Sequence, residues 1–287
     1  MRPIMPSNSS MLVCRAVMSA AYGWVLVVAL LALVGCRPGG ESSGVSPSAE
    51  EPHVLRIAAA SDLKFALDEV IQAYQKDHAA VRIEATYGSS GNLYAQLTNR
   101  APFDLFLSAD IGYPRKLIDA GLADPASEFL YGIGQIVVWS AKDSKLAVDQ
   151  RGIESLKDPA VRRIAIANPA HAPYGRAAEA ALKSLGAYEA VQDRLVLGDN
   201  IAQTAQFVES GAADVGIIAL ALALAPPMRD KGRYWLVPVD SYPRLEQGGV
   251  IMSDTRERKE TEGFRAYLID RPGREIMAGY GFALPEE

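Results

Sequence analysis

The chain is poor in cysteine and histidine. It has two cysteines, Cys14 and Cys36, and three histidines among 287 residues. Beyond Cys36 there is no thiol, which excludes a disulfide framework and a cysteine-based metal site from the rest of the chain. The histidines, His53, His78 and His171, show no metal-ligand spacing. We therefore expect neither a bound metal cation nor a cofactor.

The chain also lacks an excess of positive charge. It has 29 basic residues against 34 acidic ones. Residues 1–35 contain two of the arginines and no acidic residue, so the chain without them has a net charge of −7. Nucleic acids are bound mainly through lysine and arginine contacts to phosphates. We therefore expect no nucleic-acid partner.

An uncharged and mostly apolar stretch covers residues 16–35, and two arginines precede it. This pattern is typical of a secretory signal peptide. The stretch ends in Leu33–Cys36, which resembles the lipobox of bacterial lipoproteins, whose cysteine is lipidated and becomes the new first residue. An uncleaved membrane anchor is the alternative, because about 20 apolar residues can span a bilayer. The sequence predicts a signal peptide over 1–35, lipidation of Cys36 and a periplasmic or cell-envelope location.

Residues 36–52 are mainly Gly, Ser, Pro and Glu, and we expect a flexible tether there. From residue 53 onward, short apolar runs alternate with segments of helical periodicity. Val54–Ala60 and Trp235–Val239 are two of the predicted strands. This alternation favours an α/β fold with parallel sheets that carry helices on both faces. The remaining 235 residues are enough for two lobes with separate cores.

Four strand-to-helix junctions are the most informative feature of the sequence. Ser61 and Ser90 follow the first two strands, and Tyr174 and Ile201 begin later helices. A helix start leaves free backbone amides at the positive end of the helix dipole, where they can bind an anion without a charged side chain. One such serine alone is most simply an ordinary helix cap. Four on matching elements predict a site for a small oxyanion at the carboxyl ends of the strands.

Several longer segments surround these junctions in a fixed order. They are Ala58–Ser61, Tyr87–Leu93, Pro102–Asp110, Asn168–Pro169 with Ala172–Gly175, and Gly279–Phe282. In these segments the chain resembles the periplasmic molybdate-binding proteins of ABC importers. The resemblance implies a type II periplasmic-binding-protein fold, in which each of two lobes is a sheet flanked by helices and the ligand lies in the interlobe cleft. It assigns 53–134 plus 238–287 to the first lobe and 135–237 to the second.

The resemblance also implies a function. It implies a monomer, held at a membrane through its lipid, that captures molybdate or tungstate and delivers it to an ABC permease. It assigns the ligand contacts to the hydroxyls of Ser61 and Ser90 and to the backbone amides of Tyr174 and Ile201, with Ser89 as a further candidate. A tetrahedral dianion offers only hydrogen-bond acceptors, so a site made of donors satisfies it and disfavours protonated anions.

Two residues depart from the family's pattern. Ala219 stands where some members place a tyrosine hydroxyl in the pocket. Members without that tyrosine use the residue after the first hydroxyl, which here is Asp62, and a carboxylate there would repel a dianion. In the simpler interpretation Asp62 caps its helix and points to solvent or to an outside partner. In the other it faces the cleft and accepts a proton from the ligand, which would favour hydrogen phosphate.

Two alternative functions follow from the same residues. The pocket could bind another tetrahedral oxyanion, phosphate or sulfate, or the chain could be a serine hydrolase that uses Ser90 and His171. The hydrolase is the weaker alternative, because Gly88–Gly91 does not have the Gly-x-Ser-x-Gly pattern of a nucleophile elbow. His171 also has no identifiable carboxylate partner in the sequence. We expect a binding protein and not an enzyme.

Overall fold

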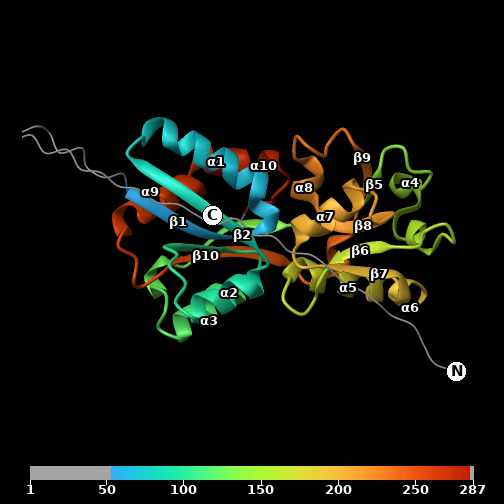
Figure 1. Cartoon of the computed structure of the whole chain (residues 1–287), viewed down its shortest axis with the longest axis horizontal. Coiled ribbons are helices and arrows are strands. Elements are labelled where there is room, and N and C mark those ends of the chain that lie inside the picture. Colours follow the sequence, from blue (N-terminus) through green and yellow to red (C-terminus); the bar gives the residue numbers. More distant parts are fainter. Residues whose placement is uncertain (1–52, 285–287) are drawn as a thin grey trace, which may run out of the picture. The chain divides into compact units, whose positions relative to one another are not determined.

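The computed structural model describes residues 53–284, which form two five-stranded sheets with helices packed against them (Figure 1). This confirms the predicted α/β class. The predicted signal peptide, the lipidated Cys36 and the tether lie outside the described residues. No helix within 53–284 is both long enough and apolar enough to cross a membrane.

The first sheet has the strand order β2-β1-β3-β10-β4. Its strands are β1 (His53–Ala60), β2 (Val81–Gly88), β3 (Leu105–Ser108), β4 (Phe129–Gly134) and β10 (Leu245–Ile251). The helices associated with it are α1 (Lys64–Asp77), α2 (Ser90–Thr98), α3 (Gly112–Asp119), α9 (Arg258–Ile269) and α10 (Arg271–Gly279), with short 3-10 turns η1 (Ser61–Leu63) and η2 (Pro125–Ser127). We call this part of the chain lobe 1.

The second sheet has the order β7-β6-β8-β5-β9. Its strands are β5 (Ile136–Ala141), β6 (Ile164–Ala167), β7 (Leu195–Gly198), β8 (Val215–Ala219) and β9 (Gly232–Leu236). Its helical elements are α4 (Val148–Arg151), α5 (Pro173–Ser184), α6 (Tyr188–Val191), α7 (Ile201–Glu209) and α8 (Leu220–Leu224), with 3-10 turns η3 (Gly152–Lys157), η4 (Gln192–Arg194) and η5 (Val239–Ser241). We call this part lobe 2.

The prediction of parallel sheets is correct only in part, because both sheets are mixed. β1 pairs in parallel with β2 and β3, but β10 runs antiparallel to β3 and β4. In lobe 2, β5 is likewise antiparallel to β8 and β9. The chain passes from β4 to β5 through the single residue Gln135 and returns after β9 through residues 237–244. The antiparallel strands β5 and β10 each follow directly on one of these two crossings.

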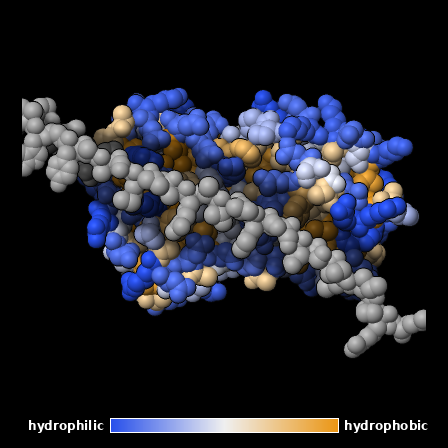
Figure 2. All heavy atoms as spheres, in the orientation of Figure 1, coloured by the Kyte–Doolittle hydropathy of each residue, from blue (hydrophilic) through white to orange (hydrophobic). Residues whose placement is uncertain are grey.

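Helices cover both faces of the first sheet, which explains the fully buried apolar run Ile57–Ala60 at the end of β1 (Figure 1). Leu55, Ile57 and Ala59 are buried in one cluster with residues of α1, α9 and α10. Ala58 belongs to a second cluster with residues of α2 and α3. The face in Figure 2 is mostly hydrophilic, and apolar side chains show there only in small separate areas. The apolar surface of the sheets is therefore inside the lobes, and their strand ends are free to form a site.

Candidate functional site

The four predicted junctions meet in one small pocket. Its lining residues are Ala60, Ser61, Asp62, Gly88, Ser89, Ser90, Ala109, Ala172, Pro173, Tyr174 and Ile201. They come from the carboxyl ends of β1 and β2 in lobe 1 and from the starts of α5 and α7 in lobe 2. The cavity volume is about 10 Å³. The structure thus brings together every residue that the sequence proposed for the oxyanion, and the pocket lies between the lobes.

Ser61 and Ser90 are buried, with 3% and 1% of their surface exposed. The Ser90 hydroxyl oxygen accepts a hydrogen bond from the amide of Ala109, at 3.0 Å. The Ser61 hydroxyl oxygen accepts one from the amide of Ala202, in the other lobe, at 3.4 Å. Within residues 53–284 neither hydroxyl donates to an acceptor. Each therefore has its proton available for an anion in the pocket.

Tyr174 and Ile201 supply helix starts from lobe 2. Pro173 is the first residue of α5, so Tyr174 follows in the first turn, where amides have no partner inside the helix. Ile201 is the first residue of α7, and the side chain of Asn200 caps this helix by accepting from the amide of Gln203, at 3.0 Å. Close packing brings α5 against β6: a Cβ atom on Gly175 would lie 2.2 Å from the carbonyl oxygen of Ala167.

The interpretation that Asp62 points to solvent is wrong. Only 1% of Asp62 is exposed. Its Oδ2 accepts hydrogen bonds from Tyr174 Oη, at 3.0 Å, and from Gln247 Nε2, at 2.7 Å. The carboxyl is held inward because two donors, one from each lobe, reach the same oxygen.

Burial raises the pKa of the Asp62 carboxyl from 3.8 to about 6, while the hydrogen bonds from Gln247 and Tyr174 act in the opposite direction. The other carboxyl oxygen, Oδ1, is buried and has no hydrogen-bond partner within residues 53–284. No sequence pattern pointed to Gln247. It is fully buried in β10, and the only trace in the sequence is a polar residue inside an otherwise buried strand.

Further contacts hold the lobes together around the pocket. The amide of Gly91 donates to the carbonyl oxygen of His171, at 2.9 Å. Arg176 Nη2 lies 2.7 Å from Asp110 Oδ2, and both side chains are partly exposed. Because Gly91 and Asp110 belong to lobe 1 whereas His171 and Arg176 belong to lobe 2, the lobes are in contact across the pocket mouth.

The proposed pairing of His171 with Ser90 is wrong. His171 Nδ1 lies 2.9 Å from the hydroxyl oxygen of Ser89, not of Ser90. Ser89 is also the N-cap of α2, and its hydroxyl accepts from the amide of Asn92 at 3.4 Å. The two neighbouring serines therefore have different surroundings. Ser89 contacts lobe 2 and caps its helix, and Ser90 is turned toward the amide of Ala109.

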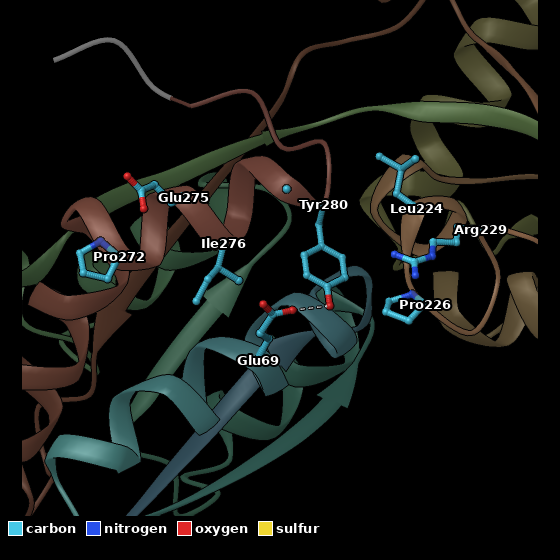
Figure 3. A pocket seen from close by; sticks show the side chains of 9 residues that line it. Glu69, Leu224, Pro226, Arg229, Pro272, Glu275, Ile276 and Tyr280 are labelled. Atoms are coloured by element: carbon cyan, nitrogen blue, oxygen red, sulfur yellow. Dashed lines mark hydrogen bonds between the residues drawn. The ribbon is translucent and has the colours of Figure 1, made fainter.

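A larger pocket lies between α1, α8 and α10, and Figure 3 shows it from close by. Glu69 and Tyr280 face each other there, with 2.8 Å between Tyr280 Oη and Glu69 Oε2. Leu224, Pro226 and Arg229 lie on the opposite side. None of the four junction residues lines this pocket. Two carboxylates, those of Glu69 and Glu275, also line it, and they would oppose a bound anion.

One group of side chains within residues 53–284 has the spacing of metal ligands, although the sequence showed no such motif. It consists of His53, Glu257 and Glu260. His53 Nδ1 lies 2.7 Å from Glu257 Oε2. The group stands at the start of β1, whereas the pocket stands at the end of the same strand. His53 and Glu257 are 204 residues apart in sequence, so no local spacing could reveal the group.

Comparison with known proteins identifies the family to which the chain belongs. The sequence pattern of the family described as "Bacterial extracellular solute-binding protein" matches residues 55–283. The chain belongs to this family. The solute-binding protein is 34% identical to the molybdate-binding protein ModA of Azotobacter vinelandii, over 84% of this chain and 94% of that one. It is 36% identical to ModA of Rhodobacter capsulatus, over 68% of this chain and 75% of that one.

The fold of this solute-binding protein also matches a solved structure of the periplasmic molybdate-binding protein of Azotobacter vinelandii. The TM-score is 0.76 at 34% sequence identity, and the match covers 81% of this chain and all of the other. The predicted two-lobed periplasmic-binding-protein architecture is thereby confirmed. The pocket between the lobes is the place where such an architecture can enclose a solute.

Proposed function

We propose that this solute-binding protein captures molybdate or tungstate outside the cytoplasm and delivers it to an ABC permease. The observation that carries the proposal is the convergence of Ser61, Ser90, Tyr174 and Ile201, from four separate helix starts, on one buried pocket. The similarity to proteins named for molybdate binding supports the choice of ligand. Among the described residues 53–284, no positively charged side chain lines this pocket, so in this proposal neutral donors hold the anion.

The four residues have defined roles in this proposal. The hydroxyls of Ser61 and Ser90 donate from lobe 1, and the amides of Tyr174 and Ile201 donate from lobe 2. They bind the oxygens of the anion and not the metal directly. Hydrogen bonds to a charged group contribute roughly 1.5–3 kcal/mol each. A rigid shell of donors fitted to molybdate or tungstate cannot contract around the smaller sulfate, which gives selectivity by size.

The proposal also covers the membrane anchoring, the oligomeric state and the mode of action of the protein. We infer that Cys36 carries a lipid, that residues 36–52 tether the folded part to a membrane, and that the protein acts as a monomer. We further infer that it binds and releases its ligand unchanged, without a cofactor and without catalysis. The contact of His171 with Ser89 supports this, because the suggested nucleophile Ser90 makes no hydrogen bond with His171 within residues 53–284.

Isothermal titration calorimetry with molybdate, tungstate, sulfate and phosphate tests the proposed ligand. We expect molybdate and tungstate to bind with dissociation constants below about 1 μM, and sulfate and phosphate at least about 100-fold more weakly. Absence of molybdate binding at micromolar concentration, or tighter binding of phosphate or sulfate, would contradict the proposal. A chromogenic ester assay on the same sample should show no turnover.

The ion pair between Arg176 and Asp110 should matter little for affinity. Its side chains are 40% and 38% exposed, and exposed ion pairs contribute about 0–1 kcal/mol. We expect Arg176→Gln to raise the dissociation constant for molybdate by no more than about fivefold in the same titration. Arg271→Gln is a matched control, because it removes an exposed ion pair with Glu275 on α10, outside the pocket. A loss of 100-fold on Arg176→Gln would show that Arg176 contacts the anion.

A further inference from the structure

A carboxylic acid lines a pocket that otherwise offers an anion only neutral donors. Asp62 stands directly after Ser61, is fully enclosed, and lines the same pocket as the four helix starts. A carboxylate and an oxyanion this close together, without water between them, repel each other strongly. One of the two must lose its charge when the lobes close. A molybdate dianion carries no proton, so it cannot neutralise the carboxylate. Asp62 can instead take a proton from solvent and become neutral.

Within residues 53–284, no cation relieves this repulsion. Tyr174 on α5 and Tyr131 on β4 face Asp62, and burial raises the pKa of both phenols well above their ordinary value, so both are neutral. On α1 and β2, Asp68 is bonded to Tyr87 at 2.5 Å, and Lys64 lies over the Tyr87 ring. The helices α7 and α8, which also pack against η1, have no charged residue before Glu209 at the far end of α7.

The geometry of Asp62 is suited to the protonated form. Oδ2 already accepts from Tyr174 and Gln247. Oδ1 is buried and has no partner within the described part of the chain. A proton on Oδ1 would turn it into one more donor in a pocket of donors.

We propose that capture of the oxyanion is coupled to the uptake of one proton by Asp62. This inference rests on the proposed function and adds to it a proton as a second ligand of the same site. The proton comes from solvent, forms an O–H bond at Oδ1 and returns to solvent when the anion leaves. The raised pKa of Asp62 in the closed structure is consistent with this, because it already lies far above that of an exposed carboxyl.

The sign of the pH dependence follows by linkage. A bound anion stabilises the protonated carboxyl, so the pKa of Asp62 is higher with the anion than without it. The affinity for the anion must then increase as pH falls from the higher of these two pKa values to the lower one. Above the higher pKa the affinity is low and no longer depends on pH. In titrations between about pH 6 and 8, where the anion keeps its double charge, we expect the dissociation constant to rise about threefold to tenfold per pH unit.

Calorimetry with molybdate in buffers of different ionisation enthalpy measures the proton directly. At about pH 6.5 we expect the uptake of between about 0.5 and 1 proton per anion bound. Asp62→Asn keeps the shape and a donor but cannot titrate. It should abolish proton uptake, remove the pH dependence and increase the affinity at about pH 8 at least about tenfold over the unmodified protein.

His171 is the control, because its imidazole contacts Ser89, which lines the same pocket. His171→Gln should retain proton uptake and the pH slope. Equal affinity at all pH values with no proton uptake would overturn the inference and leave molybdate binding intact. Loss of the slope in His171→Gln but not in Asp62→Asn would also overturn it. Absence of binding to any of the four oxyanions would instead contradict the proposed function itself.

Discussion

Replacing both Ser61 and Ser90 by alanine should lower the affinity for molybdate by about two to four orders of magnitude. Each hydroxyl is buried in the pocket, and its oxygen already accepts a backbone amide, so its proton is free to donate to an anion oxygen. Loss of two hydrogen bonds to a charged group costs about 3–6 kcal/mol in binding free energy. Calorimetry of the two single variants and of the double variant measures the effect.

Ser140→Ala is a matched control for these variants. Ser140 is fully buried in β5, its hydroxyl has no partner within residues 53–284, and it does not line the pocket. Its replacement removes the same atom from an equally buried position, so the affinity for molybdate should stay within about twofold of the unmodified protein. A double variant of Ser61 and Ser90 that binds as tightly as Ser140→Ala would show that the anion lies elsewhere.

The positions of the four helix starts could be predicted because each depends on a short stretch of sequence. An apolar strand, a small or capping residue and a helical segment define the junction at Ser90 within about ten residues. Parallel strands then bring such junctions to one edge of a sheet. Local pattern indicated the junctions at Ser61, Ser90, Tyr174 and Ile201, whereas the meeting of junctions from two sheets in one interlobe pocket was implied by the resemblance to the molybdate-binding proteins.

The direction of Asp62 could not be predicted in the same way. It is set by Tyr174 and Gln247, which lie 112 and 185 residues further along the chain. Helix-capping statistics describe only neighbours in sequence, so they favoured solvent for a residue whose partners are distant. The predicted bounds of the strand at Trp235–Val239 were also wrong. The observed strand, β9, is Gly232–Leu236, because pairing with β5 and not apolar content fixes its ends.

Gly91→Val should abolish high-affinity binding without unfolding either lobe. A Cβ atom on Gly91 would lie 2.6 Å from the carbonyl oxygen of His171 and 3.0 Å from its Cα. These are backbone atoms of the other lobe, and they cannot rotate away as a side chain could. The clash is relieved only if the lobes separate, and separation removes the donors of Tyr174 and Ile201 from the donors of lobe 1.

The expected loss for Gly91→Val is at least about 100-fold in molybdate affinity, because half of the proposed donors no longer reach the anion. Small-angle X-ray scattering should show no decrease in radius of gyration on adding molybdate, while circular dichroism and the melting temperature without ligand stay unchanged. Gly279→Val at the end of α10 is the control, because no atom lies within 4 Å of the Cβ position there. Normal affinity without compaction in Gly91→Val would mean that the anion is bound without closure. In that case lobe 1 alone would hold it, and the contact between Gly91 and His171 would have no part in binding.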